Sequence, residues 1–240
     1  MTEKKYQIIY EQLKQEIRQG TYPQGQLLPS EMELCQRFET SRETLRKSLQ
    51  LLQNDAYIQK IRGKGSVIIY DPSLNFELAN LTSFQEINHG LDQPYQTVVA
   101  LVEKIKAKDY PQVKRALQLR DFDPIIRVIR LRKKGDQVNI VDIDFFNPQL
   151  IPGLTTEVAQ GSIYRYIEEN LGLVISHSAK TITFQPADSS LTDYFQNLDP
   201  AYVALVEATV FLGDGQPFQL NQSHHRPSSF KFTNFSRRHP

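Results

Sequence analysis

Three short amphipathic segments followed by two short strands fill the first seventy residues, and few small folds have this order. Apolar residues recur at helical spacing from Lys5 to Gln19, which predicts a first helix. The sequence LPSEMELCQRF predicts a second helix, because Ser30 is a good N-cap and Glu33, three residues later, completes a capping box. The first half of this part of the chain is therefore helical.

A third helix is predicted to begin at Ser41, with Leu45, Leu49 and Leu52 on its inward side. The runs AYIQKI and SVIIY then predict two strands joined by the turn Arg62-Gly63-Lys64-Gly65. A helix, a short turn at Glu39-Thr40, a second helix and a hairpin are the order of a winged helix-turn-helix.

The residue types at the start of the third helix and in the hairpin turn suit DNA. A recognition helix contacts base edges with its N-terminal residues, and arginine can bind guanine or phosphate. Glycine in the turn removes side-chain bulk beside DNA. The predicted DNA-contacting residues are Ser41, Arg42, Thr44, Arg46, Arg62, Gly63, Lys64 and Gly65. Taken singly, each has a plainer explanation, a solvated helix face or an ordinary hairpin turn.

The rest of the chain predicts an α+β domain with a mostly antiparallel sheet. Residues 71–79 form an expected linker, and residues 80–240 the second domain. Long apolar strands separated by hairpin signals favour antiparallel pairing over a doubly wound sheet. Strands are predicted near residues 97–105, 125–131, 138–146, 173–184, 202–212 and 217–225, and helices near 81–87, 112–117, 162–170 and 189–197.

Several residues of this second domain could bind an anion. Arg130 and Arg132 are two apart on a strand, so they point to the same face. Thr82 or Ser83, and Ser162, stand at predicted helix N-termini, where backbone N–H groups are available to a phosphate. The candidate anion-contacting residues are Thr82, Ser83, Arg130, Arg132, Ser162 and Tyr164, and Asp142 and Gln219 on later strands could bind sugar hydroxyls. The alternative is that the serines only cap helices and the arginines form the wet side of a sheet.

Composition excludes several classes of protein. No apolar run approaches the roughly 18 residues of a membrane helix, and the N-terminal residues contain no apolar block typical of export. The single cysteine, Cys35, cannot form an internal disulfide and is expected in a reducing cytoplasm. No metal-ligand spacing or nucleophile motif is present, so neither a metal site nor an enzyme is predicted. Residues 1–70 carry 11 Lys and Arg against 8 Asp and Glu, a mild basic excess.

The stretch from LPSE to the G-K-G turn resembles the DNA-binding domain of GntR-family bacterial transcription regulators. The shared signature is L-P-S-E, then S-R-x-T-x-R, then a G-x-G wing. The resemblance implies contacts from the recognition helix and from the wing tip, and it implies double-stranded operator DNA as partner. Two positions depart from the family pattern, which often has arginine at Met32 and glycine at Glu39.

The second domain resembles the effector-binding (UTRA) domain of the HutC subfamily, which has a chorismate-lyase-like fold. The resemblance rests on L-T-S-F-x-E, R-x-R, VDIDFFNP and G-S-x-Y. It implies a homodimeric repressor, no cofactor, and a sugar phosphate as effector. The predicted effector residues that it implies are the candidates named above together with Phe84. The ending SHHRPSSFKFTNFSRR is similar to that of trehalose operon repressors, which implies trehalose 6-phosphate. A different sugar phosphate, a lyase-like enzyme and an architectural DNA-binding protein are the alternatives.

Overall fold

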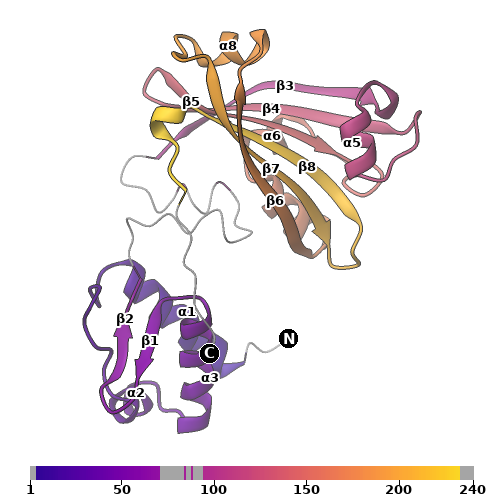
Figure 1. Ribbon diagram of the computed structural model, residues 1–240. Helices are drawn as coiled ribbons and strands as arrows, with labels where there is room; N and C mark the ends of the chain where they lie inside the picture. The colour runs from indigo at the N-terminus through magenta and orange to yellow at the C-terminus, as the bar shows by residue number, and fades with distance from the viewer. Residues whose placement is uncertain (1–3, 71–83, 85–87, 89–93, 233–240) are drawn as a thin grey trace. The chain divides into compact units, whose positions relative to one another are not determined.

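The computed structural model describes residues 4–70, 84, 88 and 94–232. The chain divides into two compact units, one around the N-terminal helices and one around a large sheet. Figure 1 shows both, and each is described by itself below. The predicted helix over residues 81–87 lies outside the described residues, except for Phe84.

The N-terminal unit has three helices and a hairpin (Figure 1). The elements are α1 (Lys5–Arg18), α2 (Glu31–Arg37), α3 (Arg42–Asn54), β1 (Ile58–Ile61) and β2 (Gly65–Ile68). Strands β1 and β2 pair antiparallel, with Ile58 opposite Ile68. All five predicted elements are present, and each predicted helix start agrees with the structure to within a residue or so.

The apolar stripes of the helices meet in one small core. Leu13 of α1, Leu34 of α2 and Leu45 of α3 are fully buried there, with Ile58 of the hairpin. Ser30 accepts from the backbone N–H of Glu33, so the predicted capping box exists. Burying such side chains contributes about 2 kcal/mol each, so this core fixes the position of α3 against the hairpin.

In the described part of the second unit, six antiparallel strands form one sheet in the order β3-β4-β5-β8-β7-β6. The strands are β3 (Gln96–Lys106), β4 (Pro124–Lys134), β5 (Gln137–Phe146), β6 (Ile175–Pro186), β7 (Tyr202–Leu212) and β8 (Pro217–His225). The other elements are η2 (Ala107–Asp109), α5 (Pro111–Ala116), α6 (Thr156–Gln160), α7 (Ile163–Arg165), η3 (Tyr166–Asn170), α8 (Ser189–Phe195) and η4 (Pro227–Ser229). The short α6 was not predicted from the sequence.

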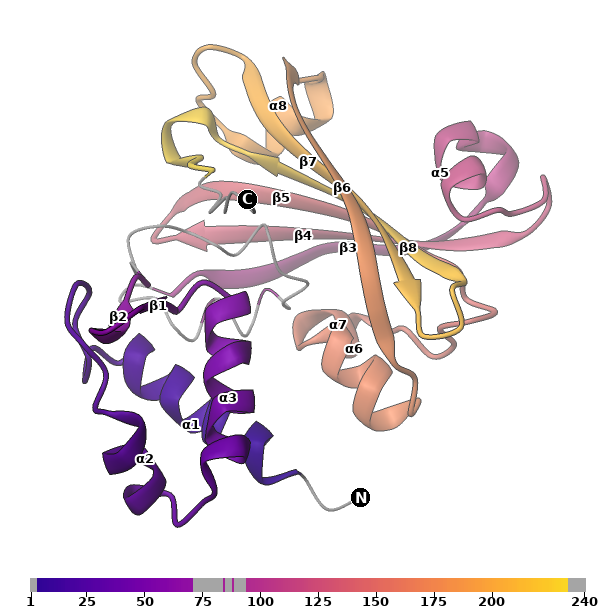
Figure 2. The ribbon, with the colours of Figure 1, turned by 60° about the horizontal axis from the view of Figure 1, so that its bottom comes forward.

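Helices cover both faces of this sheet. Helices α5 and α8 lie at opposite ends of it (Figures 1 and 2) and pack on the face that carries Ile125, Ile129 and Val141. The segment from α6 to η3 packs on the other face, against Ile126 and Val128. Because alternate residues of a strand point to opposite faces, β4 contributes to a core on each side.

The turn between α2 and α3 contains a strained residue. Glu39 has a φ of 46°, in the left-handed region that L-residues enter at a cost. The backbone N–H of Thr40 donates to Cys35 O at 3.1 Å and that of Glu39 to Gln36 O at 3.3 Å, the hydrogen bonds of a Schellman motif. Glycine is the usual residue at this position of the motif.

Glu39→Gly is expected to stabilise the protein by up to about 1 kcal/mol, because glycine adopts positive φ without the steric cost that the Cβ imposes. The gain should appear as a higher urea midpoint for the N-terminal unit. Glu39→Ala is the matched control, since it removes the carboxylate and keeps the Cβ. If both variants gained equally, the charge rather than the backbone would be responsible.

Candidate functional sites

The N-terminal unit presents basic side chains on the exposed side of α3 and at the hairpin turn. Ser41 is the N-cap of α3, and its Oγ accepts from the backbone N–H of Thr44 at 3.2 Å. Arg42 is exposed at the first position of the helix. Arg46 lies one turn further on, and its side chain is 63% exposed. The predicted contact residues of α3 therefore lie on the surface rather than in the core.

The residues of the hairpin turn are also exposed to solvent. Arg62 and Lys64 are exposed, and the backbone N–H of Lys64 donates to Ile61 O at 3.1 Å to close the turn. Gly63 and Gly65 have φ values of 78° and 115°, which favour glycine. A Cβ at Gly63 would meet nothing within 4 Å, so backbone conformation and not crowding within the protein selects glycine there.

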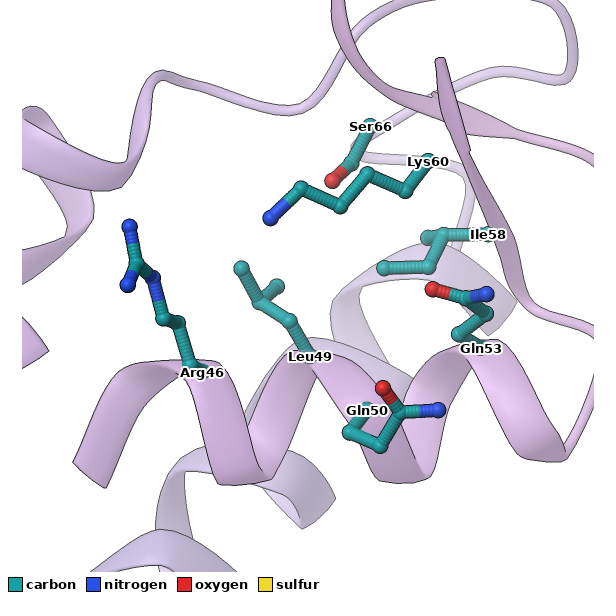
Figure 3. Close-up of a pocket in the computed structure, with 7 residues that line it drawn as sticks. All are labelled: Arg46, Leu49, Gln50, Gln53, Ile58, Lys60 and Ser66. Carbon is teal, nitrogen blue, oxygen red and sulfur yellow. The ribbon is translucent and has the colours of Figure 1, made fainter. Parts of the chain in front are cut away.

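A shallow pocket separates the exposed side of α3 from the hairpin. It is lined by Arg46, Leu49, Gln50, Gln53, Ile58, Lys60 and Ser66, as Figure 3 shows. Arg46 and Lys60 extend into it from opposite sides, with Leu49 between them (Figure 3). Both cations are paired with Glu31 at the start of α2.

The second unit contains polar and charged side chains in the middle of its sheet. On the face covered by α6 and η3, β4 is apolar at Ile126 and Val128 and then carries Arg130 and Arg132. We call the group that this face brings together the buried polar cluster. It consists of Arg130 and Arg132 from β4, Asp142 and Asp144 from β5, and Gln219, Asn221, Ser223 and His225 from β8. The first five are buried, and Asn221, Ser223 and His225 are half-buried.

Two ion pairs form the centre of the buried polar cluster. Arg130 Nη2 donates to Asp144 Oδ2 at 2.7 Å, and Arg132 Nε donates to Asp142 Oδ2 at 2.8 Å. Arg132 is 1% exposed and Asp144 is wholly buried. Charges this deep are tolerated only when they are paired, because removing an ion from water costs several kcal/mol.

Neighbouring polar groups complete the pairing. Asp144 Oδ1 accepts from the side-chain amides of Gln219 and Asn221, at 2.7 and 2.9 Å. Asp142 Oδ1 accepts from Ser223 Oγ. Arg132 Nη1 donates to Thr97 Oγ1 of β3 at 2.7 Å. Each carboxylate is thus hydrogen-bonded through both of its oxygens.

Three buried polar atoms of the cluster have no hydrogen-bond partner among the described residues. They are Arg130 Nε, Arg132 Nη2 and Gln219 Oε1. An unpaired buried polar group typically costs about 1–3 kcal/mol. Two donors and one acceptor therefore remain for a bound molecule, which would need oxygen acceptors for the arginines and a hydroxyl or amine donor for Gln219.

The two arginines differ in how well their charge is compensated. Burial lowers the pKa of Arg130, but the nearby Asp144 and Asp142 outweigh it and leave that pKa above its ordinary value. Burial and the adjacent Arg130 lower the pKa of Arg132 to about 10, despite Asp142. Both remain cationic at neutral pH, and an anion beside Arg132 would relieve the repulsion between them.

Of the other predicted effector residues, one lies against Arg132, two lie at α7, and two are outside the described residues. Phe84 lies against Arg132, with the guanidinium carbon 3.9 Å from the ring centroid. Ser162 is the N-cap of α7, where its Oγ accepts from the backbone N–H of Arg165 at 3.2 Å. Tyr164 packs against the core between α7 and the sheet and is close enough to Arg130 to affect its pKa. Thr82 and Ser83 lie outside the described residues.

Sequence reasoning missed half of the buried polar cluster. Asp144, Asn221, Ser223 and His225 were not among the predicted residues, although Asp144 receives hydrogen bonds from three side chains. A signal was present for Asp144, because aspartates alternate with apolar residues in VDIDFF and such alternation in a strand places both aspartates on one face. QLNQSHH gave no such signal, since six of its seven residues are polar.

The part of the chain that the structure describes contains no group of three or more His, Cys, Asp or Glu residues arranged to hold a metal ion. Among the same residues, no helix is long and apolar enough to cross a membrane.

Comparison with known proteins assigns both units. Residues 5–68 match the family described as bacterial regulatory proteins, gntR family, and residues 92–231 match the UTRA domain. The HTH-type transcriptional regulator TreR of Bacillus subtilis is 36% identical over 234 residues, which cover 98% of each chain.

Solved structures agree with this assignment. The structure of YydK, a possible transcriptional regulator of B. subtilis, covers 98% of this chain and all of its own, with a TM-score of 0.81 at 24% identity, which supports the fold. The effector binding domain of the B. subtilis trehalose repressor (TreR) is 33% identical, with a TM-score of 0.54. It covers 60% of this chain and 99% of its own.

His225 allows a test of how strongly the buried polar cluster excludes water. Its Nε2 lies 3.1 Å from Ser223 Oγ, and its ring packs against Phe230. Burial, and to a smaller extent the neighbouring His224, lower its pKa to about 4, while Asp142 acts in the opposite direction. The folded protein therefore keeps this imidazole neutral in mild acid.

We expect the free energy of unfolding to fall as the pH is lowered from about 6.5 towards 4, because the unfolded state then binds a proton that the folded state excludes. His225→Gln should retain up to about 3 kcal/mol more of its neutral-pH stability at the acid end of this range. Urea unfolding of both proteins at several pH values measures this, with His177→Gln, an exposed position, as control. Parallel curves for wild type and His225→Gln would contradict burial of the ring.

Proposed function

Because this chain belongs to the gntR family of bacterial regulatory proteins, we propose that it is a transcriptional repressor released from its operator by a sugar phosphate. The family consists of transcription regulators and not of enzymes, as the sequence predicts. The protein acts in the cytoplasm as a homodimer and presents two copies of α3 to a palindromic operator. Dimeric recognition suits palindromic DNA because the two-fold symmetry of the protein then matches that of the site.

On the DNA side, the proposal assigns α3 to the major groove and the hairpin to the adjacent groove. Arg42 and Arg46 contact bases or phosphates, and Ser41 and Thr44 allow the N-terminus of α3 to approach the backbone closely. Arg62 and Lys64, with Gly63 and Gly65, form the wing tip. The supporting observation is that the cationic members of this set are exposed on one small, well-packed unit.

On the effector side, one observation carries the proposal. Two buried arginine donors on β4 and one amide acceptor on β8 have no hydrogen-bond partner among the described residues, and all three side chains belong to the same face of the sheet. Phosphate oxygens fit Arg130 Nε and Arg132 Nη2, and a sugar hydroxyl fits Gln219 Oε1. Phe84, Asp142, Ser162 and Tyr164, with Thr82 and Ser83, complete the proposed effector site. No cofactor is needed.

We propose trehalose 6-phosphate as the effector. The 36% identity to TreR along nearly the whole chain, and the likeness to the effector binding domain of the B. subtilis trehalose repressor, support this choice. A neutral amide at Gln219 suits a sugar hydroxyl better than the ammonium of an amino sugar. The alternative is another sugar phosphate recognised by the same arginines.

Release from DNA follows from differential affinity. An effector can shift the protein away from its DNA-binding conformation only by as much as it binds the other conformation more tightly. A shift from 1:99 to 99:1 requires about 5.5 kcal/mol of such preference.

Saturating trehalose 6-phosphate is expected to weaken operator binding at least tenfold, measured by fluorescence anisotropy. Trehalose without phosphate, inorganic phosphate and glucose 6-phosphate form the comparison panel. Arg132→Gln should lose the response while still binding the operator, with circular dichroism confirming that it folds. Arg127→Gln is the matched control, because Arg127 lies on the same strand but pairs with Glu103 on the opposite face. Undiminished operator binding by the wild type at saturating effector would contradict induction.

Arg62→Ala is expected to lower operator affinity and to reduce the slope of log K against log salt by about 0.9, because one phosphate contact releases about one counterion. Titrations between 50 and 300 mM salt measure the slope. Lys114→Ala is the control, since Lys114 pairs with Asp121 near α5 in the second unit. An unchanged slope for Arg62→Ala would remove the wing tip from the DNA-contacting surface.

A further inference from the structure

One carboxylate connects three elements of the N-terminal unit. Glu31, the first residue of α2, accepts from Arg46 Nε of α3 at 3.0 Å through Oε2 and from Lys60 Nζ of β1 at 2.7 Å through Oε1. The Glu31 side chain is 27% exposed, whereas those of Arg46 and Lys60 are 63% and 54% exposed. The two cations thus reach outward from a more sheltered anion.

The hydrogen bond to Glu31 leaves the Nη1 and Nη2 donors of Arg46 available for a base. Glu31 engages Arg46 through Nε, and a guanidinium binds guanine in bidentate fashion through its other donors. An arginine side chain in solution has about 2 kcal/mol of rotamer entropy to lose when it is ordered on a base. Because Glu31 restricts Arg46 before DNA arrives, part of that loss has already occurred in the free protein.

The Glu31 carboxylate also connects α3, the proposed recognition helix, to the hairpin, the proposed wing. Lys60 lies on β1, immediately before the strand end at Ile61 and the exposed turn at Arg62. Arg46 and Lys60 face each other across the pocket in Figure 3, with Leu49 between them. Through Glu31, the distance between the tip of Arg46 and the wing is set by two hydrogen bonds.

The negative charge of Glu31 is unfavourable for DNA binding in every other respect. Hydrogen bonding to Lys60 and Arg46 outweighs partial burial and lowers its pKa, so it is ionised at neutral pH. A carboxylate on a DNA-facing surface repels phosphates and weakens sequence-independent binding. Exposed ion pairs of this kind also contribute only about 0–1 kcal/mol to folding, which gives Glu31 little structural value.

We propose that Glu31 is a positioning residue for operator recognition, which orients Arg46 for base reading and fixes its distance from the wing. This inference rests on the proposed DNA-binding function. It predicts opposite effects on two affinities. Removing the charge weakens binding to the operator, because Arg46 is no longer oriented, and leaves binding to unrelated DNA unchanged or stronger.

The test uses the full chain and an operator selected from random duplexes by the wild-type protein. Dissociation constants are measured by anisotropy for this operator and for a scrambled duplex of equal length, at one salt concentration. Glu31→Gln is expected to lower the ratio of operator to scrambled affinity about tenfold, and repeated selection with this variant should give a relaxed consensus. The thermal midpoint of unfolding should stay close to that of the wild type.

Glu11→Gln is the matched control. Glu11 also lies on the N-terminal unit, and it pairs with Lys14 at 3.7 Å on the surface of α1. This substitution removes the same charge outside α2, α3 and the hairpin. It should leave the ratio of the two affinities unchanged.

A double-mutant cycle completes the design. If Glu31 acts through Arg46, Glu31→Gln should not change the affinity ratio further in an Arg46→Ala background. An unchanged ratio in Glu31→Gln, an equal fall in Glu11→Gln, or a parallel loss of both affinities with early unfolding would each overturn the proposal. A wild-type protein without any preference for the selected operator would instead contradict the proposed function itself.

Discussion

The pairing of buried charges in the large sheet is the interaction on which the second unit depends. Arg130 and Arg132 are covered by protein, and each is stable there only because an aspartate of the neighbouring strand meets it. Register decides this, since Arg130 lies opposite Asp142 and beside Asp144 along the same face. A slip of β4 by one residue would turn both arginines to the apolar face under α8, away from the two aspartates on β5. The strand register therefore brings these charges into pairs, and the cost of an unpaired buried charge favours this register.

The two units use cations in opposite ways. In the sheet, Arg130 and Arg132 are buried and paired with carboxylates, and each has one nitrogen without a hydrogen-bond partner among the described residues. These two nitrogens are the donors to which the proposed effector would bind. On the N-terminal unit, Arg42, Arg46, Arg62 and Lys64 remain in solvent, where each contact with a long polyanion is weak but many can add.

The elements of the fold could be predicted well, because their signals are local. The capping box at Ser30, the leucines of α3 and the glycines of the hairpin turn act within a few residues, and the structure confirms each. The placement of Arg130 and Arg132 on the same face of β4 followed from strand alternation alone. Their burial did not, because the groups that meet them, Thr97, Asp142, Asp144 and Tyr164, come from other strands and from α7.

The sequence by itself determined the kinds of side chain available to each unit and the faces on which they stand, since spacing fixes direction in helices and strands. Only the tertiary structure decided which acidic and basic side chains form ion pairs. Asp144 joins Arg130, 14 residues away, with Gln219, 75 residues away, and Glu31 joins Arg46 and Lys60 from separate elements. Such partners are chosen by packing and strand order, which act between segments that no local pattern connects.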